Sequence, residues 1–219
     1  MKFRSLLIVI YLFLLGFTFS LSANDYNFGD NELMLLVTAD TLPKGSITLS
    51  NYELSLFNVT IGISKNTQIG VSGILPMFGE RGGAYLCVKQ RIINTRKLKI
   101  AAWGSGNASG FLAGGVASYG TEKTNVHMGV AVFSTFSDNL RNFFLTAGIR
   151  QKLSKNIFLI GEYYSKFKFK DLDKGVVLGG CRIRTKWILF DIGGFYGMKF
   201  DHDVLFWPYL KVSFLLKSH

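Results

Sequence analysis

The spacing of apolar residues along this chain has a period of two from about residue 30 onward. In the segment 126–133, every even position is valine or methionine, and the odd positions are His127, Gly129, Ala131 and Phe133. The segments 97–103, 145–150 and 210–217 alternate in the same way. No apolar period of 3.6 residues persists over three helical turns. Because successive side chains of a strand point to opposite faces, this pattern predicts β-strands with one apolar face.

Two kinds of connection alternate along the chain between the predicted strands. Tight polar turns are predicted at 64–66, 94–96, 121–124, 154–156 and 184–186. Longer or more irregular connections are predicted at 76–83, 107–110, 135–142, 167–175 and 199–208. Tight turns at one end of the strands and longer loops at the other are typical of a transmembrane barrel, and a soluble sandwich has no reason to keep that order.

The number of strands tests this interpretation. From 47–63 to 209–217 the pattern gives about eleven segments, and an even-stranded barrel needs one more. The segment Glu32–Thr38 supplies it, with 41–44 as the connecting loop. The sequence therefore predicts an all-β fold, an antiparallel up-and-down transmembrane β-barrel of about 12 strands within a range of about 10–14. Both termini are expected on the periplasmic side.

The N-terminal residues predict export. Lys2 and Arg4 precede an apolar run of about 14 residues, 6–19, and small residues follow as far as Ala23. A membrane-spanning helix needs roughly 20 apolar residues, so the run favours a cleaved signal peptide, 1–23, over an uncleaved anchor. No cysteine follows closely, which disfavours a lipoprotein. The mature chain, 24–219, is long enough for one domain, a single β-barrel.

The amino-acid composition agrees with a barrel, and the distribution of its basic residues argues against nucleic-acid binding. Aromatic residues make up 15% of the chain and 24 residues are glycine, which suits curved strands with interfacial rings. Removal of Lys2 and Arg4 leaves 23 basic and 14 acidic residues, a formal charge of +9. The basic residues are spread over many strand ends of an exported chain, so nucleic-acid binding is not expected.

Parity assigns the charged strand residues to the lumen, because lipid-facing charge is costly. The expected basic ring near the short-turn end consists of Lys89, Arg91, Lys97, Lys99, Arg150, Lys152, Arg182 and Arg184. Mid-lumen ion pairs are expected among Glu162, Asp191 and Lys211. The ring predicts a periplasmic mouth that attracts anions. Two simpler interpretations stay open: basic residues collect at wet strand ends without selectivity, or side chains fill the lumen.

Catalytic and metal-binding patterns are weak. The histidines His127, His202 and His219 are scattered, and neither they nor Cys87 and Cys181 have metal-ligand spacing. Export permits a disulfide, but two separate strand cysteines are more often free. No cofactor is expected and no catalytic residue is assigned. A lipid hydrolase or acyltransferase would require a serine within hydrogen-bond reach of a histidine, oriented by a third group.

The whole mature chain resembles outer-membrane β-barrel proteins of Gram-negative bacteria. The resemblance rests on the signal peptide, the alternating strands, the Ser-Lys-Asn turns at 64–66 and 154–156, and the strand-forming C-terminus. Residues 42–45 followed by 51–54, LPKG and NYEL, resemble barrels of unassigned substrate from Bacteroidetes-type bacteria. The resemblance implies insertion into the outer membrane by the barrel-assembly machinery. The usual terminal aromatic residue is displaced here, because Phe214 precedes five further residues.

Three functions are compatible with these patterns. The first is an outer-membrane barrel that is either a small passive pore with a basic periplasmic mouth or a structural membrane protein. The second is an outer-membrane enzyme that modifies lipid, and the third is an exported soluble β-sheet protein that binds a partner. The first is favoured, with outer-membrane lipid and the assembly machinery as its partners.

Overall fold

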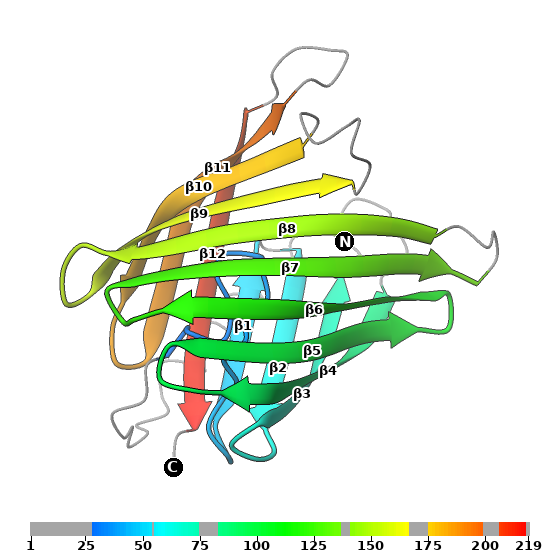
Figure 1. Ribbon diagram of the computed structural model, residues 1–219, viewed down its shortest axis with the longest axis horizontal. Helices are drawn as coiled ribbons and strands as arrows, with labels where there is room; N and C mark the ends of the chain where they lie inside the picture. Colours follow the sequence, from blue (N-terminus) through cyan, green and yellow to red (C-terminus); the bar gives the residue numbers. More distant parts are fainter. Residues whose placement is uncertain are drawn as a thin grey trace, which may run out of the picture.

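The fold is a closed antiparallel β-barrel, as predicted. A computed structural model describes residues 28–53, 55–74, 83–136, 141–166, 175–198 and 206–217. In these ranges it contains twelve strands and no helix, and each strand pairs with its sequence neighbours while β1 pairs with β12 (Figure 1). None of the described residues forms a helix with the length and apolarity that crossing a membrane requires. The strands are β1 (Ile47–Tyr52), β2 (Leu56–Gly62), β3 (Thr67–Ile74), β4 (Gly83–Asn94), β5 (Leu98–Asn107), β6 (Gly110–Gly120), β7 (Thr124–Thr135), β8 (Arg141–Lys152), β9 (Ile157–Lys166), β10 (Gly175–Arg184), β11 (Ile188–Met198) and β12 (Phe206–Lys217).

The period of two places apolar side chains on the outer face of the wall. On β7, Met128 and Val130 point outward and are 59% and 57% exposed, whereas Asn125, His127 and Ala131 are buried. A closed sheet has no unpaired edge, so every wall strand is hydrogen-bonded on both sides. The barrel therefore has an apolar outside and an inside that must be filled by something else.

The predicted tight turns are present at one end of the barrel. They connect β2 to β3, β4 to β5, β6 to β7, β8 to β9 and β10 to β11. At the other end, the connection at 107–110, predicted among the longer or more irregular ones, is instead tight, because only Ala108 and Ser109 separate β5 from β6. The Asn107 side chain accepts the N–H groups of Ser109 at 2.8 Å and Gly110 at 3.2 Å. This local capping closes a tight hairpin.

Two errors cancel in the predicted strand count. The segment 47–63 is not one strand, because the chain reverses after Tyr52 and forms β1 and β2. Glu53 has a φ of 49° at this reversal, and the Ser55 N–H donates to the Tyr52 carbonyl at 3.2 Å. The segment Glu32–Thr38, predicted as the twelfth strand, is not part of the wall. It contributes only an isolated bridge between Glu32 and Val37.

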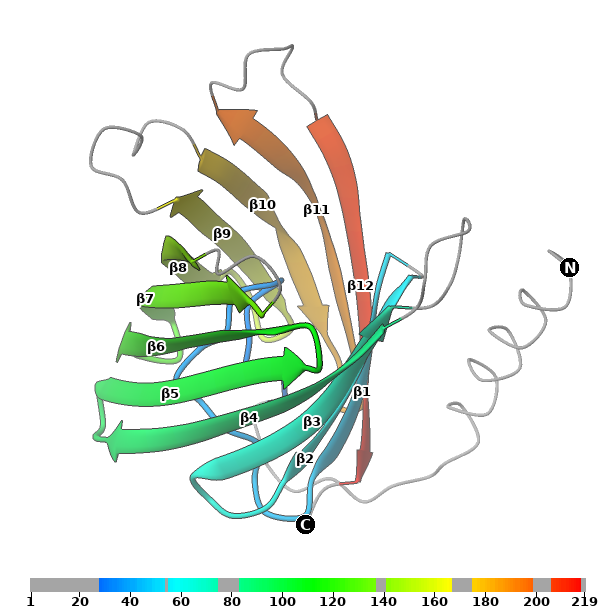
Figure 2. The same cartoon turned by 90° about the vertical axis from the view of Figure 1, so that its right-hand side faces the viewer.

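Residues 28–42, which precede β1, run through the inside of the barrel. Figure 2 shows this segment as a blue trace enclosed by the strands. β12 ends beside the start of β1, with Lys217 opposite Ile47, so the last strand finishes at the short-turn end. The predicted signal peptide, residues 201–203 with His202, and His219 lie outside the described residues.

Candidate functional site: an occupied barrel lumen

Residues 28–42, here called the plug, occupy the barrel lumen. Leu33, Met34 and Leu42 are completely enclosed. The plug reverses once, with the Leu33 N–H donating to the Leu36 carbonyl at 2.9 Å and the Thr38 N–H donating to Asn31 at 3.4 Å. These bonds satisfy a minority of its backbone groups. Because buried N–H and C=O groups need partners, the barrel wall has to supply the rest.

Glycines on the inner wall make room for the apolar side chains of the plug. A Cβ atom at Gly148 would lie 2.5 Å from Leu33 Cδ1 and 2.7 Å from Leu36 Cδ2. A Cβ atom at Gly180 would lie 2.7 Å from Met34 Cε. Both positions point into the lumen, so a larger residue there would collide with the plug. The same apolar cluster includes the wall residues Tyr52, Ile160, Leu178 and Tyr209.

The Glu162 carboxylate on β9 holds the turn of the plug. It accepts the backbone N–H groups of Met34 at 2.5 Å, Leu35 at 3.1 Å and Leu36 at 3.1 Å. The Tyr164 hydroxyl donates to the same carboxylate at 2.5 Å. Three successive N–H groups that converge on one anion form a strong, charge-assisted contact.

The Arg182 guanidinium on β10 binds the carbonyl side of the plug. Its Nη1 donates to the carbonyls of Gly29 at 2.5 Å and Glu32 at 2.9 Å, and its Nη2 donates to Leu33 at 2.7 Å. The same group forms a bidentate pair with Asp191 on β11, at 2.7 and 2.8 Å. Asp191 thus orients the arginine whose remaining donors hold the plug.

Lys211 on β12 completes this contact from the neighbouring strand. Its Nζ lies 2.7 Å from Glu32 Oε1, and it donates to the carbonyls of Leu33 and Met34, each at 3.2 Å. Asp191 Oδ2 is 3.9 Å away. Lys211 and Asp191 are both fully enclosed. The lysine therefore pairs with an acid of the plug at closer range than with an acid of the wall.

Both ends of the plug carry an aspartate that meets wall cations. Asp30 contacts Arg150 on β8, and it lies 3.4 Å from Arg184 on β10. Asp40 lies 2.5 Å from Lys99 Nζ on β5. The chain between these two acids is short, and the acids contact different strands of the wall. They fix the plug at two points in the lumen.

Two cations on β4 bind the middle and the end of the plug. Lys89, buried in the lumen, donates to the carbonyls of Asn31 at 2.7 Å and Thr38 at 3.1 Å. Arg91 Nη1 lies 3.7 Å from Asp40 Oδ1. Asn31 and Thr38 stand on the two arms of the plug, so Lys89 bridges them.

The predicted charged residues differ in where they lie. Six members of the predicted basic ring contact the plug: Lys89, Arg91, Lys99, Arg150, Arg182 and Arg184. Lys97 does not join them and is exposed in the turn between β4 and β5; Lys152 is half-buried at the end of β8. Of the predicted mid-lumen trio, Asp191 and Lys211 are neighbours, whereas Glu162 binds backbone N–H groups of the plug.

The plug is the functional element that sequence reasoning missed. The run 33–37 is apolar at every position, whereas a wall strand with one face in the lumen should alternate. The run also lies among the acids Asp30, Glu32 and Asp40. The alternation of side chains, in turn, predicted more basic than acidic residues on the inner face of the wall. An apolar segment flanked by acids and a cation-rich lumen are complementary, and that is the signal that could have found it.

A serine and a histidine of the lumen meet at hydrogen-bond distance. Ser118 Oγ on β6 lies 2.7 Å from His127 Nδ1 on β7, and Ser118 accepts the Ala39 N–H at 2.9 Å. Ser118 and His127 are each 1% exposed, and His127 Nε2 has no hydrogen-bond partner in the described ranges. A nucleophilic site needs an accessible serine and an oriented base. This serine is covered by the plug, so the pair positions the plug backbone.

Other chemistry is sparse in the described part of the chain. It contains no group of three histidine, cysteine, aspartate or glutamate residues that could hold a metal ion. Cys87 and Cys181 are both free thiols, on β4 and β10. No protein-family profile matches this chain, and a comparison with curated proteins finds no match.

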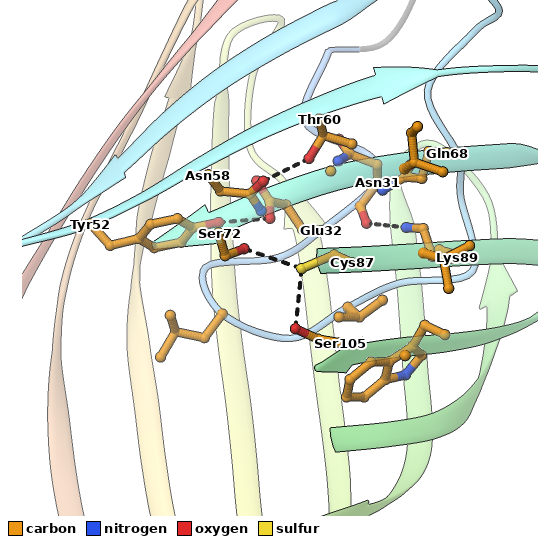
Figure 3. A pocket seen from close by; sticks show the side chains of 17 residues that line it. Asn31, Glu32, Tyr52, Asn58, Thr60, Gln68, Ser72, Cys87, Lys89 and Ser105 are labelled. Carbon is orange, nitrogen blue, oxygen red and sulfur yellow. Dashed lines mark hydrogen bonds between the residues drawn. The ribbon is translucent and has the colours of Figure 1, made fainter. Parts of the chain in front are cut away.

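The plug leaves part of the lumen unfilled. A cavity of about 200 Å³ remains between the plug and the inner wall on the side of β2 to β5 (Figure 3). Its lining combines plug residues such as Asn31 and Glu32 with wall residues such as Asn58, Cys87 and Lys89. The plug therefore fills the lumen only in part.

Proposed function

We propose that this chain is an integral outer-membrane β-barrel whose aqueous passage is closed by its own plug. The observation that carries the proposal is the distribution of charge across the wall. Each charged strand residue whose side chain is described has the parity of the lumen: Lys89, Arg91, Lys99, Arg150, Lys152, Glu162, Lys166, Arg182, Arg184, Asp191 and Lys211. A charge on the lipid face would cost roughly 2–4 kcal/mol near the bilayer midplane.

The outer face supports a bilayer as the surrounding medium. Leu86 on β4 is 67% exposed, and Met128 on β7 and Ile192 on β11 are 59% and 56% exposed. Water-soluble monomers rarely expose contiguous apolar surface on this scale. The alternative of an exported soluble binding protein would leave this surface in water, so the membrane barrel is the better proposal. Its partners are then outer-membrane lipid and the machinery that inserts barrels.

The plug favours a closed barrel over a small passive pore. A basic periplasmic mouth would attract anions only if its cations were free to face the passage. Here Arg182 is saturated by Asp191 and plug carbonyls, and Arg150 contacts Asp30. These cations have the plug as their counter-ion. The role proposed for them is to hold the passage shut.

A lipid-modifying enzyme is the weaker candidate. Ser118 and His127 lie at the right distance from each other, yet both face the lumen beneath Ala39. A lipid in the bilayer would reach the outer face of β6 and β7 and would not meet the serine. No catalytic step is therefore proposed for this pair.

Cell fractionation followed by gel electrophoresis of unheated and heated samples tests the membrane assignment. We expect the protein in the outer-membrane fraction, with a faster-migrating band before heating. Recovery in the soluble periplasmic fraction would overturn it.

Planar-bilayer conductance tests the closure. The wild-type chain should pass little current, and Gly148→Leu should conduct, because the new side chain occupies the space of Leu33 and Leu36. The matched control is Gly179→Leu, where a Cβ atom has nothing within 4 Å and the side chain points outward. Wild-type conductance as high as that of Gly148→Leu would contradict the closed state.

A further inference from the structure

The cavity beside the plug has the composition of a binding site for a small solute. Figure 3 shows Asn58, Thr60 and Ser72 pointing into the same space as Cys87 and Ser105. With about 200 Å³, it is smaller than the roughly 300–1,000 Å³ of pockets for drug-sized ligands. Its occupant can be no larger than about a monosaccharide.

Uncharged hydrogen-bonding groups line one side of the cavity. Cys87 Sγ lies 3.3 Å from Ser72 Oγ and 3.2 Å from Ser105 Oγ, and the Thr60 hydroxyl donates to Asn58 Oδ1 at 2.8 Å. Hydroxyl groups donate and accept, and an amide side chain offers both functions at fixed positions. This set matches a ligand that also carries both donors and acceptors.

The charged side chains of the cavity already have partners within the barrel. Glu32 pairs with Lys211 at 2.7 Å and accepts the Tyr52 hydroxyl at 2.9 Å. Lys89 Nζ donates hydrogen bonds to the backbone carbonyls of Asn31 and Thr38. A charged ligand would have to break these contacts or remain without a counter-ion, which is costly in a buried site. The site is therefore suited to an uncharged molecule.

Apolar surface completes the lining. Leu35 of the plug is 40% exposed although it lies inside the barrel, and it lines the cavity together with the half-buried Trp103. Gly70 has no side chain to fill the space, and a Cβ there would lie 2.7 Å from the Val59 carbonyl oxygen. The electron-rich face of an indole ring contacts polarised C–H groups well. Apolar and hydroxyl-bonding surfaces thus lie side by side.

We infer that this cavity binds an uncharged, hydroxyl-rich solute of at most monosaccharide size. Hydroxyl groups of the solute would bond to the side of Asn58 and Ser72, and its C–H face would cover Leu35 and Trp103. The inference rests on the lumen alone and holds whether or not the barrel is in a membrane.

Trp103 provides a direct measurement. The refolded chain with Trp187→Phe and Trp207→Phe has Trp103 as its sole tryptophan. Its fluorescence is followed during titration with D-glucose, N-acetyl-D-glucosamine and D-glucuronate, the last as a charged counterpart of glucose. We expect a saturable change with a neutral sugar and a much weaker response to glucuronate.

Paired asparagine variants show whether the binding is in the cavity. Asn58→Leu removes a cavity amide and should weaken binding about tenfold, because it leaves hydroxyl groups of the ligand without a partner. Asn51→Leu is the matched control, since Asn51 lies on the adjacent strand β1, opposite Phe57 of β2, and has outward parity. It should leave the affinity unchanged.

Thiol labelling gives a second readout that does not depend on the asparagine variants. In a Cys181→Ser background, Cys87 is the sole thiol, and bound sugar should slow its reaction with N-ethylmaleimide. The inference is overturned if no neutral sugar gives saturation or protects Cys87, which is the result for a cavity that holds only water. Equal or tighter binding of glucuronate, or equal affinities of Asn58→Leu and Asn51→Leu, would also overturn it.

Discussion

Replacement of Glu162 by alanine should release the plug without opening the barrel wall. The carboxylate is 3% exposed and accepts three successive N–H groups of residues 34–36. Its removal leaves these donors, and the Tyr164 hydroxyl, without their acceptor. The backbone pairing of β9 with β8 and β10 does not involve the side chain, so the wall should stay closed.

The size of the effect follows from these contacts. A hydrogen bond to a charged group contributes about 1.5–3 kcal/mol. At the lower value, loss of the three hydrogen bonds together costs about 4.5 kcal/mol. Water entering the vacated volume restores part of this, so we expect a net loss of about 2–3 kcal/mol in the free energy of plug opening. That loss corresponds to about 30- to 150-fold more frequent opening.

Hydrogen exchange of the backbone amides measures this opening directly. The peptide containing residues 34–36 should exchange about 30- to 150-fold faster in Glu162→Ala than in the wild-type chain. Glu162→Gln keeps one acceptor oxygen and should show a smaller acceleration, and Gln90→Ala, an outward change on β4, should show none. Heat-modifiable gel mobility reports whether the wall remains folded.

Unchanged exchange at residues 34–36 in a folded Glu162→Ala barrel would refute this reasoning. It would mean that the apolar contacts of the plug with the inner wall are sufficient to hold it and that the hydrogen bonds to Glu162 do not stabilise its position. Equal acceleration in β6 and β7 would also refute it, because the carboxylate would then stabilise the wall.

Two further substitutions test which residues of β10 face the lumen and how much the Asp191 charge stabilises the barrel. Gly180→Ala should lower the free energy of unfolding, measured by urea titration, by about 1–3 kcal/mol, because its Cβ would lie 2.4 Å from the Ile192 carbonyl oxygen and 2.7 Å from Met34 Cε. Gly179→Ala next to it has open space and should change this free energy by less than about 0.5 kcal/mol. Equal effects at both positions would contradict the assigned parity. Asp191→Asn leaves the enclosed Arg182 without its counter-ion and should cost about 3–5 kcal/mol, measured by the same urea titration. An unchanged midpoint would show that the plug carbonyls alone satisfy the arginine.

The two errors in the predicted strand count show which parts of the fold the pattern of neighbouring residues can predict. Alternation identified the wall strands from β3 onward, because each needs one apolar and one polar face whatever its neighbours are. The sequence pattern does not predict the reversal after Tyr52. Glu53 and Ser55 interrupt the alternation for a few residues only, and the turn contains no glycine or proline. A tight turn of ordinary residues leaves a weak pattern.

The charged lumen was partly predictable for a related reason. Parity placed Arg182, Asp191 and Lys211 inside, because a charge cannot face an apolar surround cheaply. Parity could not say what these charges bind. The plug partners of Arg182 and Lys211, Gly29 and Glu32, are about 150–180 residues away along the chain. The contacts of Arg182 with them use backbone carbonyls, which carry no sequence signature.

By itself, the sequence determined the β-barrel class, the inward or outward side of the residues in the alternating strands from β3 onward, and the tight turns at one end. These properties depend on neighbours one or two residues apart, which is the range of the period-two pattern. The tertiary structure alone decided that residues 28–42 enter the lumen, that Glu162 and Arg182 bind them, and that a cavity remains beside Cys87. Closure of the wall creates the enclosed space that makes burial of this apolar segment favourable, so the plug becomes visible once the barrel is complete.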